Sequence, residues 1–396
     1  MKFELFIANR LKTGKVENDK SSTPSLNVAV IGMTLAITIM ILSITIVCGF
    51  KKEISNKIYN LDSHIKIVTS SINNKESEIK HITDNIENIS YVSEKSIVLK
   101  TNNDFKGIIY KGVNENYDWS YLKENLIDGK LPNFNDSTRT NNIIISKKTA
   151  SEMHLKTGDK VYAYFIDNNN IKARSLTISG IYNTGLVEYD KTYIIGNNNV
   201  LNNIRNVTSY IGVNCKDYDD IDHVTLQLRN HFSNDNNILH ISNTTRNNIS
   251  YFTWLKLLDT NVIVIIIIML LVTSFTLISA MLMIVLERIN FIGILKTLGT
   301  TNDSIRKIFI YLTNKLILKS LLLGNIIGLS LSFIQNEYKL IKLDTESYYI
   351  PHVPIEIDWF FIIILNFGII LVAYISLLAP SHIISKIEPN KSIKFE

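Results

Sequence analysis

Long stretches without Asp, Glu, Lys or Arg limit what this chain can fold into more than any other feature. They cover residues 26–49, 261–286 and 359–384. A helix needs about 20 apolar residues to cross the hydrocarbon core of a bilayer. Each stretch is long enough, so the sequence predicts an integral membrane protein.

A fourth candidate span, 308–334, contains Lys315 and Lys319 in its first half. Long lysine side chains can reach the nearer membrane surface while their stems stay in hydrocarbon. The two lysines could also face a polar interior, and we favour the first interpretation. The first span could be a cleaved signal peptide, but its apolar core exceeds about 7–15 residues and no Ala-x-Ala site follows. We therefore expect four spans.

Basic residues in the short flanking segments predict the orientation, because Lys and Arg are enriched on the cytoplasmic side. Three groups would lie on one side of four spans: Lys2, Arg10, Lys12, Lys15 and Lys20; Arg288, Lys296, Arg306 and Lys307; Lys386, Lys391 and Lys394. Trp254 and Trp359 then fall at the opposite interface, where indole rings prefer to lie.

These signals divide the chain into nine segments. They are a cytoplasmic tail (1–24), span one (25–49), an external domain (50–256), span two (260–286), a cytoplasmic segment (287–306), span three (308–334), a short external loop (335–357), span four (358–380) and a cytoplasmic tail (381–396). The fold class is an α-helical membrane protein with four transmembrane helices and a large α+β domain inserted between helices 1 and 2.

The external domain mixes strand-like and helical runs without regular alternation, which is typical of α+β domains. Strands are predicted at 65–68, 107–110, 142–146, 161–166, 175–182, 192–196 and 209–213. Helices are predicted at 52–61, 76–88, 147–154 and 218–232. The first of these would extend span one as a stiff lever.

The sequence shows no constellation that points to catalysis, a bound cofactor or a metal. The chain has no His-Glu-x-x-His, Cys-x-x-Cys or Gly-x-Ser-x-Gly motif, and no P-loop to hold ATP. Cys48 and Cys215 form no disulfide framework. The net charge of +5 is too modest and too dispersed for nucleic-acid binding. Any ATP that drives this protein must be bound by another polypeptide.

Three segments together resemble one family. They are GFKKEISNKIYNLDSHIKIV (49–68), the region 126–165 with its continuation through 174–190, and ERINFIGILKTLGTTNDSIRKIFI (287–310). They resemble the FtsX/MacB-type ABC transporter permeases and, within that group, the LolC/LolE lipoprotein-releasing permeases. The C-terminal residues 377–396 are similar to the family's closing pattern, with Lys394 and Phe395 in place of the usual Arg and Tyr.

The resemblance implies a multi-pass permease of the bacterial inner (cytoplasmic) membrane with a periplasmic domain after span one. It implies pairing with a second permease copy or a paralogue, and with LolD-like cytoplasmic ATPase subunits that hold ATP and Mg. It also implies extraction of lipoprotein substrates from the outer leaflet and their transfer to a periplasmic carrier resembling LolA. A MacB-like efflux permease, an FtsX-like signalling permease and a non-transporting membrane receptor remain alternatives.

Segment 287–306 is the predicted ATPase-coupling element. Apolar and charged residues alternate in it as in a short amphipathic helix that docks into a groove of a partner. We expect Gly299 to end that helix, and Asp303 and Ser304 to begin the next. The candidate coupling residues are Glu287, Arg288, Ile292, Leu295, Lys296 and Leu298.

Gly324, Gly328 and Ser332 recur every four residues in span three. Such a stripe of small residues lets two membrane helices approach closely. The stripe could form a permease interface around the lipid-anchor site, or it could pack within one subunit. Both interpretations stay open.

Two further candidates concern the substrate and its carrier. Residues 164–175 predict an exposed hairpin, and in the family that the chain resembles a loop near this position binds the carrier. Because the segment is short and Asn-rich, a plain surface hairpin is an equal alternative. The candidate carrier-binding residues are Tyr164, Phe165, Ile171 and Arg174. Phe50, directly after span one, is a candidate lipid contact, or alternatively an anchor at the membrane interface.

Overall fold

The computed structural model describes residues 4, 6, 7, 22–69, 75–101, 104–132, 141–167, 170–233, 235 and 238–385. It divides into two compact units. The helical unit comprises Met1–Lys52, Leu255–Lys342 and His352–Glu396, and the sheet unit comprises Glu53–Trp254 and Leu343–Pro351. The predicted tails 1–24 and 381–396 lie largely outside the described residues.

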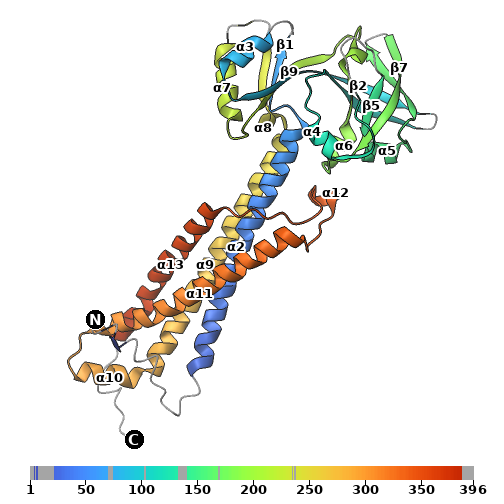
Figure 1. Cartoon of the computed structure of the whole chain (residues 1–396). Helices are drawn as coiled ribbons and strands as arrows, with labels where there is room; N and C mark the ends of the chain where they lie inside the picture. The colour runs from blue at the N-terminus through green and yellow to red at the C-terminus, as the bar shows by residue number, and fades with distance from the viewer. Residues whose placement is uncertain are drawn as a thin grey trace. The chain divides into compact units, whose positions relative to one another are not determined.

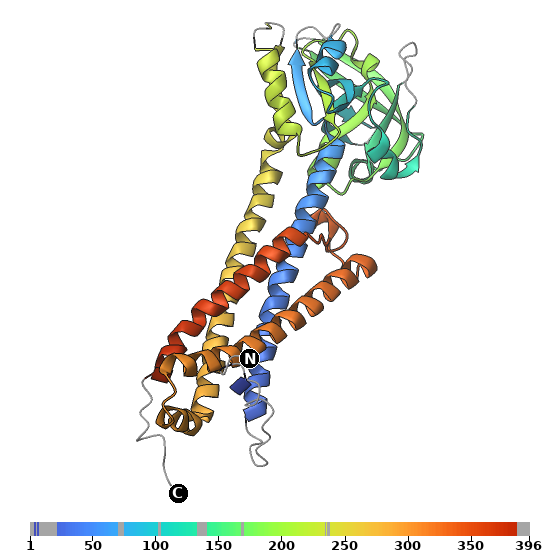
Figure 2. The ribbon, with the colours of Figure 1, turned by 60° about the vertical axis from the view of Figure 1, so that its left-hand side comes forward.

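Four long helices build the helical unit (Figures 1 and 2). They are α2 (Ser22–Leu61), α9 (Ile249–Glu287), α11 (Asn302–Tyr338) and α13 (Trp359–Ser385). Each is long and apolar enough to cross a membrane, which confirms the four predicted helices. With 40 residues, α2 is about 60 Å long, twice the roughly 30 Å of a hydrocarbon core. The predicted helical extension of span one over 52–61 is therefore confirmed.

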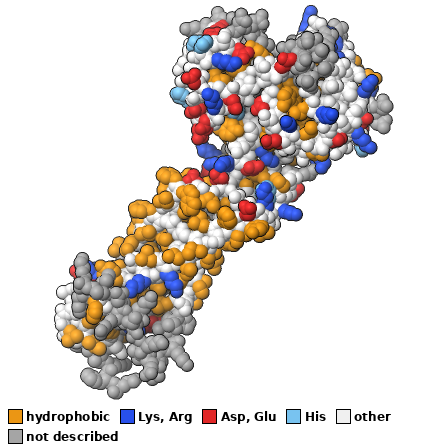
Figure 3. All heavy atoms as spheres, in the orientation of Figure 1, with side chains coloured by type: hydrophobic (Ala, Val, Ile, Leu, Met, Phe, Trp, Pro, Cys, Tyr) orange, Lys and Arg blue, Asp and Glu red, His pale blue; other side chains and the backbone are white. Residues whose placement is uncertain are grey.

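Helix α2 is the most enclosed of the four. In its most apolar window 56% of the residues are buried, against 17% in α9 and 28% in α11 and α13. Its residues Ile37, Met40 and Ile41 form a core cluster with apolar residues of α9 and α13. Figure 3 shows many hydrophobic side chains on the visible face of the helices, as expected for a surface solvated by lipid.

A short helix, α10 (Ile289–Thr297), joins α9 to α11. Gly299 has φ +82°, and the Thr300 and Gly299 amides donate to the carbonyls of Leu295 and Lys296 at 3.0 and 3.1 Å. This is the Schellman motif, so the prediction that Gly299 ends the helix is confirmed. The expected start at Asp303 and Ser304 is one residue late, because α11 begins at Asn302. Thr301 is the N-cap of α11, because its hydroxyl accepts the Ser304 amide.

The sheet unit contains β1 (Ile65–Thr69), β2 (Ile86–Lys100), β3 (Phe105–Val113), β4 (Leu126–Gly129), β5 (Asn142–Ser146), β6 (Lys160–Asp167), β7 (Asn170–Tyr182), β8 (Tyr193–Asn197), β9 (Thr208–Cys215) and β10 (Ile238–Asn243). Its shorter helices are α3 (Lys75–Ile82), α4 (Ser120–Glu124), α5 (Lys147–Glu152), α6 (Val187–Thr192), α7 (Ile221–His231), α8 (Thr244–Asn247) and α12 (Thr345–Tyr348), with the 3-10 turn η1 (Asn198–Leu201). The α+β prediction for this region is confirmed.

One sheet organises the unit into two lobes (Figure 1). The strand order is β10-β1-β9-β2-β3-β8-β5-β7-β4, and β6 pairs with both β2 and β7. Strands β2, β3, β8, β5, β7 and β6 therefore close a ring around a buried core that includes Leu99, Tyr110 and Phe165. In the other lobe, α3 and α7 cover β10, β1, β9 and the first half of β2.

The longest strand, β2, is absent from the sequence prediction, as are β4 and β10. The predicted helix 76–88 is also too long, because α3 ends at Ile82 and β2 begins at Ile86. β2 carries polar residues such as Asn88, Ser90 and Glu94 among its apolar ones. Pairing with β9 along its first half and with β3 along its second outweighs that weak local signal.

Candidate functional site

The coupling segment has a buried side and an exposed side. Ile292 and Leu295 are buried in a cluster with residues of α9 and α11, so they hold α10 in place. Glu287, Ile294 and Leu298 are exposed, and Leu298 is 77% exposed. Arg288 and Lys296 are half-buried. The surface that a partner could contact thus contains Ile294, which the predicted set omits, and lacks Ile292 and Leu295.

The small-residue stripe packs within one subunit. A Cβ atom added to Gly324 would lie 2.7 Å from Cβ of Ile37, and one added to Gly328 would lie 3.1 Å from Cβ of Ile41. The Ser332 hydroxyl lies 3.1 Å from the Thr45 hydroxyl. All three stripe residues therefore face α2 of the same chain.

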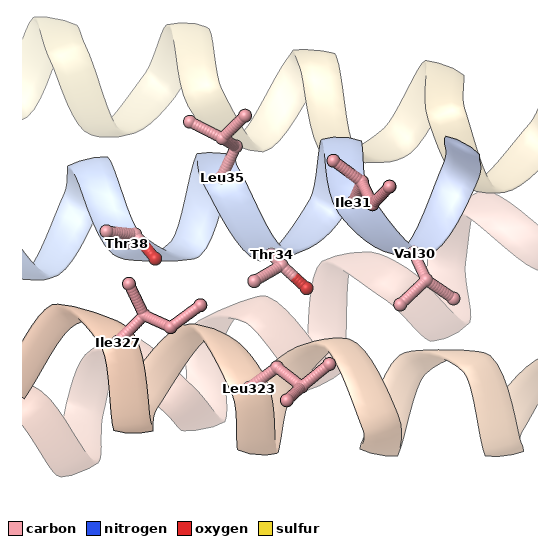
Figure 4. A pocket seen from close by; sticks show the side chains of 7 residues that line it. All are labelled: Val30, Ile31, Thr34, Leu35, Thr38, Leu323 and Ile327. Atoms are coloured by element: carbon pink, nitrogen blue, oxygen red, sulfur yellow. The ribbon is translucent and has the colours of Figure 1, made fainter. Parts of the chain in front are cut away.

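Beside this close contact lies an apolar groove of about 270 Å³ (Figure 4). It is lined by Val30, Ile31, Thr34, Leu35 and Thr38 of α2 and by Leu323 and Ile327 of α11. Figure 4 shows the two threonines on the side of α2 that faces α11, opposite Leu323 and Ile327. The groove opens to the surroundings of the helices, so hydrocarbon can enter it from the side.

The two hydroxyls in the groove differ. The Thr38 hydroxyl donates to the Gly324 carbonyl at 3.4 Å. Thr34 is only 8% exposed, yet its hydroxyl has no hydrogen-bond partner within the described residues. A groove with this lining can hold a hydrocarbon chain and offers one polar contact to it. The sequence did not reveal these residues, because apolar residues occur on several faces of both spans and the pattern does not show which face pairs with the other helix.

Strands β6 and β7 form the predicted hairpin, paired from Lys160 opposite Thr177 to Asp167 opposite Asn170. The hairpin itself is therefore confirmed, and its tip, 168–169, lies outside the described residues. Phe165 is completely buried in the ring and packs edge-on against Tyr110, so a partner cannot contact it. Tyr164 is half-buried, and half-buried Arg174 donates to the Asn202 carbonyl at 2.8 Å.

The remaining candidate, Ile171, is 68% exposed and lies directly opposite exposed Ile166. Another exposed row crosses the same sheet at the base of the hairpin. Lys100 lies opposite Phe105 on one side and opposite Tyr162 on the other, and Phe105 is 81% exposed. Exposed aromatic and aliphatic side chains on a sheet face are typical of protein-binding surfaces. Sequence reasoning missed this row because it depends on β2.

A buried ion pair holds the end of α2 within the sheet unit. The Lys111 ammonium is 1% exposed and lies 3.3 Å from the Leu61 carbonyl and 3.4 Å from the Asp62 carboxylate. Lys66 bonds the same carboxylate at 2.7 Å. Burial opposes ionisation of Asp62, but Lys66 and Lys111 outweigh it and hold the pKa of Asp62 below its usual value. A positive charge at a helix C-terminus is favourable, so α2 is firmly anchored there.

The other sequence candidates give no chemical site. Phe50 is half-buried. Cys48 and Cys215 are free thiols. In the part of the chain that the structure describes, no group of three or more His, Cys, Asp or Glu could hold a metal ion.

Comparison with known proteins assigns the chain to a class and then to a family. It is a multi-pass membrane protein with four apolar helices and a MacB-like α+β domain. The FtsX-like permease C-terminal domain matches residues 263–389, and the MacB-like periplasmic core domain matches residues 28–231, more than half of the chain. The chain therefore belongs to the FtsX/MacB-type family of ABC transporter permeases. Membership implies an ABC ATPase and a second permease as partners.

Two curated relatives extend over nearly the whole chain. The lipoprotein-releasing system transmembrane protein LolC of Xylella fastidiosa (strain 9a5c) is 20% identical over 390 residues, covering 93% of each protein. The corresponding LolE of Haemophilus influenzae is 21% identical over 417 residues, covering 98% of each. The extracellular domain of the ABC-type transporter YknZ from Gram-positive bacteria aligns with 46% of this chain and 99% of that domain, at 17% identity and a TM-score of 0.32. A structural similarity this low supports no inference.

Proposed function

We propose that this chain is the permease subunit of a transporter that extracts lipoproteins from the outer leaflet of the bacterial inner membrane and passes them to a soluble periplasmic carrier. Relatives named for lipoprotein release over nearly the whole chain support the proposal. The observation that carries it is the apolar groove between α2 and α11, which opens sideways at the depth of the membrane-spanning segments. A lipoprotein presents acyl chains, and such a groove can accept one of them.

The proposed topology follows the distribution of basic residues. Segments 1–24, 287–306 and 381–396 are cytoplasmic, while 50–256 and 335–357 are periplasmic. The predicted spans 25–49, 260–286 and 308–334 lie within α2, α9 and α11, and the predicted span 358–380 begins one residue before α13.

The ATPase subunit would bind α10 from the cytoplasm. Its contact surface would include exposed Glu287, Ile294 and Leu298, with Arg288 and Lys296 at the edge. ATP and Mg would then belong to that subunit. Buried Ile292 and Leu295 would transmit the force by fixing α10 to the ends of α9 and α11.

The carrier would bind the exposed face of the ring in the sheet unit. Ile166 and Ile171 of the hairpin and the row of Phe105, Lys100 and Tyr162 offer apolar contacts around one positive charge. Such a surface fits a carrier whose own binding face is apolar with an acidic rim.

Reconstitution in proteoliposomes with the ATPase, the partner permease, an acylated lipoprotein and the carrier tests the proposal. We expect ATP-dependent transfer of lipoprotein to the carrier. Thr34→Phe fills the groove and should lower transfer at least tenfold while ATP hydrolysis continues. The control, Phe275→Trp, changes an exposed position on α9 and should leave transfer unchanged.

The wild-type complex tests the proposed function, and Thr34→Phe tests the groove as the acyl site. If the wild-type complex transfers no lipoprotein, the function is wrong, and efflux or signalling becomes the better assignment. If Thr34→Phe transfers lipoprotein as well as wild type, the function stands and the groove is not the acyl site.

A further inference from the structure

The loop between α11 and α13 contains a segment that belongs to the sheet unit. We call Leu343–Pro351 the strap loop, because the residues before and after it belong to the helical unit while the loop itself belongs to the sheet unit. Its ends are joined by a bond from the Leu343 amide to the Pro351 carbonyl at 2.9 Å. Ile350 is 1% exposed. The strap loop is thus a closed, docked structure.

One lysine from the end of α2 holds the strap loop. The half-buried Lys57 ammonium donates to the Tyr349 carbonyl at 3.0 Å and to the Thr184 carbonyl at 3.2 Å. It thereby links three segments that are far apart in the sequence: α2, the strap loop and the turn after β7. Hydrogen bonds from a charged donor are stronger than those between neutral groups.

The backbone around Lys57 is shaped for this contact. Gly185 has φ +78°, and a Cβ atom added there would lie 3.1 Å from the Tyr349 carbonyl oxygen and 3.2 Å from Nζ of Lys57. Tyr349 itself has φ +63°, a conformation that is unfavourable for a non-glycine residue. Its ring packs edge-on against Tyr251 and Trp254. Several contacts therefore hold Tyr349 in a conformation that it would not adopt alone.

The connection continues into the ring of strands. The Thr184 hydroxyl donates to the Asp190 carboxylate at 2.8 Å, and the Thr184 amide donates to the same carboxylate at 3.3 Å. Asp190 lies in α6, directly before β8 of the ring. Hydrogen bonds therefore run without a break from Tyr349 through Lys57 and Thr184 to Asp190, next to the ring.

We propose that Lys57 is a positioning residue that couples movement of α11 and α13 to the sheet unit, by holding the strap loop against the end of α2. This inference rests on the proposed function for its biological role, since a carrier-loading domain must respond to ATP hydrolysis elsewhere in the protein. Besides α2 and α9, the two ends of the strap loop provide two further covalent connections between the helical unit and the sheet unit.

Hydrogen exchange of the intact complex tests this role without needing a substrate. Lys57→Met keeps the aliphatic stem and removes the donor, whereas Lys57→Arg keeps charge and donors. In Lys57→Met we expect amides of 343–351 to exchange at least tenfold faster. In wild type, ATP with vanadate should change the exchange of residues 184–190, and this change should be lost in Lys57→Met and retained in Lys57→Arg.

Lys95→Met is the matched control, because Lys95 also bonds two backbone carbonyls of the sheet unit, those of Arg205 and Asn206 at 3.0 and 3.1 Å. It should alter neither exchange pattern. Gly185→Ala is a second route to the same defect, since its methyl group would displace Tyr349.

The inference is overturned if Lys57→Met leaves exchange of the strap loop unchanged. It is equally overturned if the loop loosens while the ATP-driven change at 184–190 persists. Lipoprotein transfer is measured separately. Failure of the wild type in that assay would refute the proposed function, whereas the exchange measurements would still decide the role of Lys57.

Discussion

The helical and sheet units obey different rules for which side chains are buried. In β1 of the sheet unit the burial alternates strictly, with Ile65, Ile67 and Thr69 inside and two partly exposed residues between them. In α9 only 17% of the most apolar window is buried, although nearly every residue in it is apolar. Water sorts side chains by polarity, whereas lipid does not. The pattern of apolar residues therefore shows which face of a strand is buried. For a membrane helix it shows only that the helix exists, and not which face is buried.

The largest expected effect tests burial in the sheet unit with one residue type. Phe165→Ala should lower the free energy of unfolding by about 3–5 kcal/mol, because a completely buried ring leaves a cavity. Phe105→Ala, at an 81% exposed position, should change it by less than about 0.5 kcal/mol. Chemical denaturation followed by tyrosine and tryptophan fluorescence measures both. Equal effects would mean that the ring interior is wrongly assigned.

A second prediction concerns Asp190, a carboxyl group that is buried inside the sheet unit. Burial raises the pKa of Asp190 to about 6, and this outweighs its bonds from Thr184. Between pH 4 and 6 the unfolded chain releases this proton while the folded chain keeps it. The contribution of Asp190 to stability therefore falls by about 3 kcal/mol as pH rises through this window.

Denaturation of wild type and Asp190→Asn across pH 4–7 isolates this contribution, because other groups titrate in both proteins. The difference between the two profiles should change by that amount between pH 4 and 6. His64 provides an internal contrast: burial lowers its pKa to about 4, so its contribution is lost as pH falls from 6.5. A flat difference profile for Asp190 would contradict the assignment.

The third prediction compares a closely packed glycine with an open one inside the helical unit. Gly324→Leu should destabilise the protein by about 1–3 kcal/mol, because its side chain would collide with Ile37 of α2. Gly368→Leu in α13 is the matched control, since nothing lies within 4 Å of an added Cβ there. Thermal unfolding in detergent should separate the two variants. Similar melting temperatures would show that the stripe does not face α2.

The smallest expected effect comes from a polar pair between α11 and α13. The side-chain amides of Asn325 and Asn366 exchange two hydrogen bonds, at 2.7 and 3.0 Å. Asn366→Leu should cost about 0.6 kcal/mol, the average for hydrogen bonds between membrane helices, and at most about 1.7 kcal/mol. Thr276→Val serves as control, because the Thr276 hydroxyl bonds only within α9. Unfolding in mixed micelles can resolve this difference, and a stabilised Asn366→Leu would show that the pair is not formed.

The same contrast explains how much the sequence could predict. The four spans, the helical extension of span one and the hairpin at 164–175 could be predicted, because each depends on a local pattern of apolar residues and turns. β2 could not, since most of its specificity comes from pairing with β9, β3 and β6. The first half of the predicted helix 76–88 was right and its end was wrong for the same reason.

The candidate sites show the same difference between features that a local sequence pattern sets and features that contacts between distant segments set. The stripe at Gly324, Gly328 and Ser332 was recognisable from its spacing, but not the helix it faces. In the coupling segment the sequence located the helix and its end at Gly299. It did not separate exposed Ile294 from buried Ile292, because both are isoleucines in an apolar run. The strap loop contact depends on Lys57, Thr184 and Tyr349, which no local pattern connects.

The central claim is that the groove between α2 and α11 holds an acyl chain of the transported lipoprotein. A lipoprotein with a photoactivatable diazirine in its acyl chain, bound to the complete complex without ATP, tests it most directly. Peptide mapping after illumination should place the label on residues 30–38 and 323–327, and ATP with carrier should remove it. Labelling confined to exposed faces such as Ile267 and Phe275 of α9 would contradict the claim.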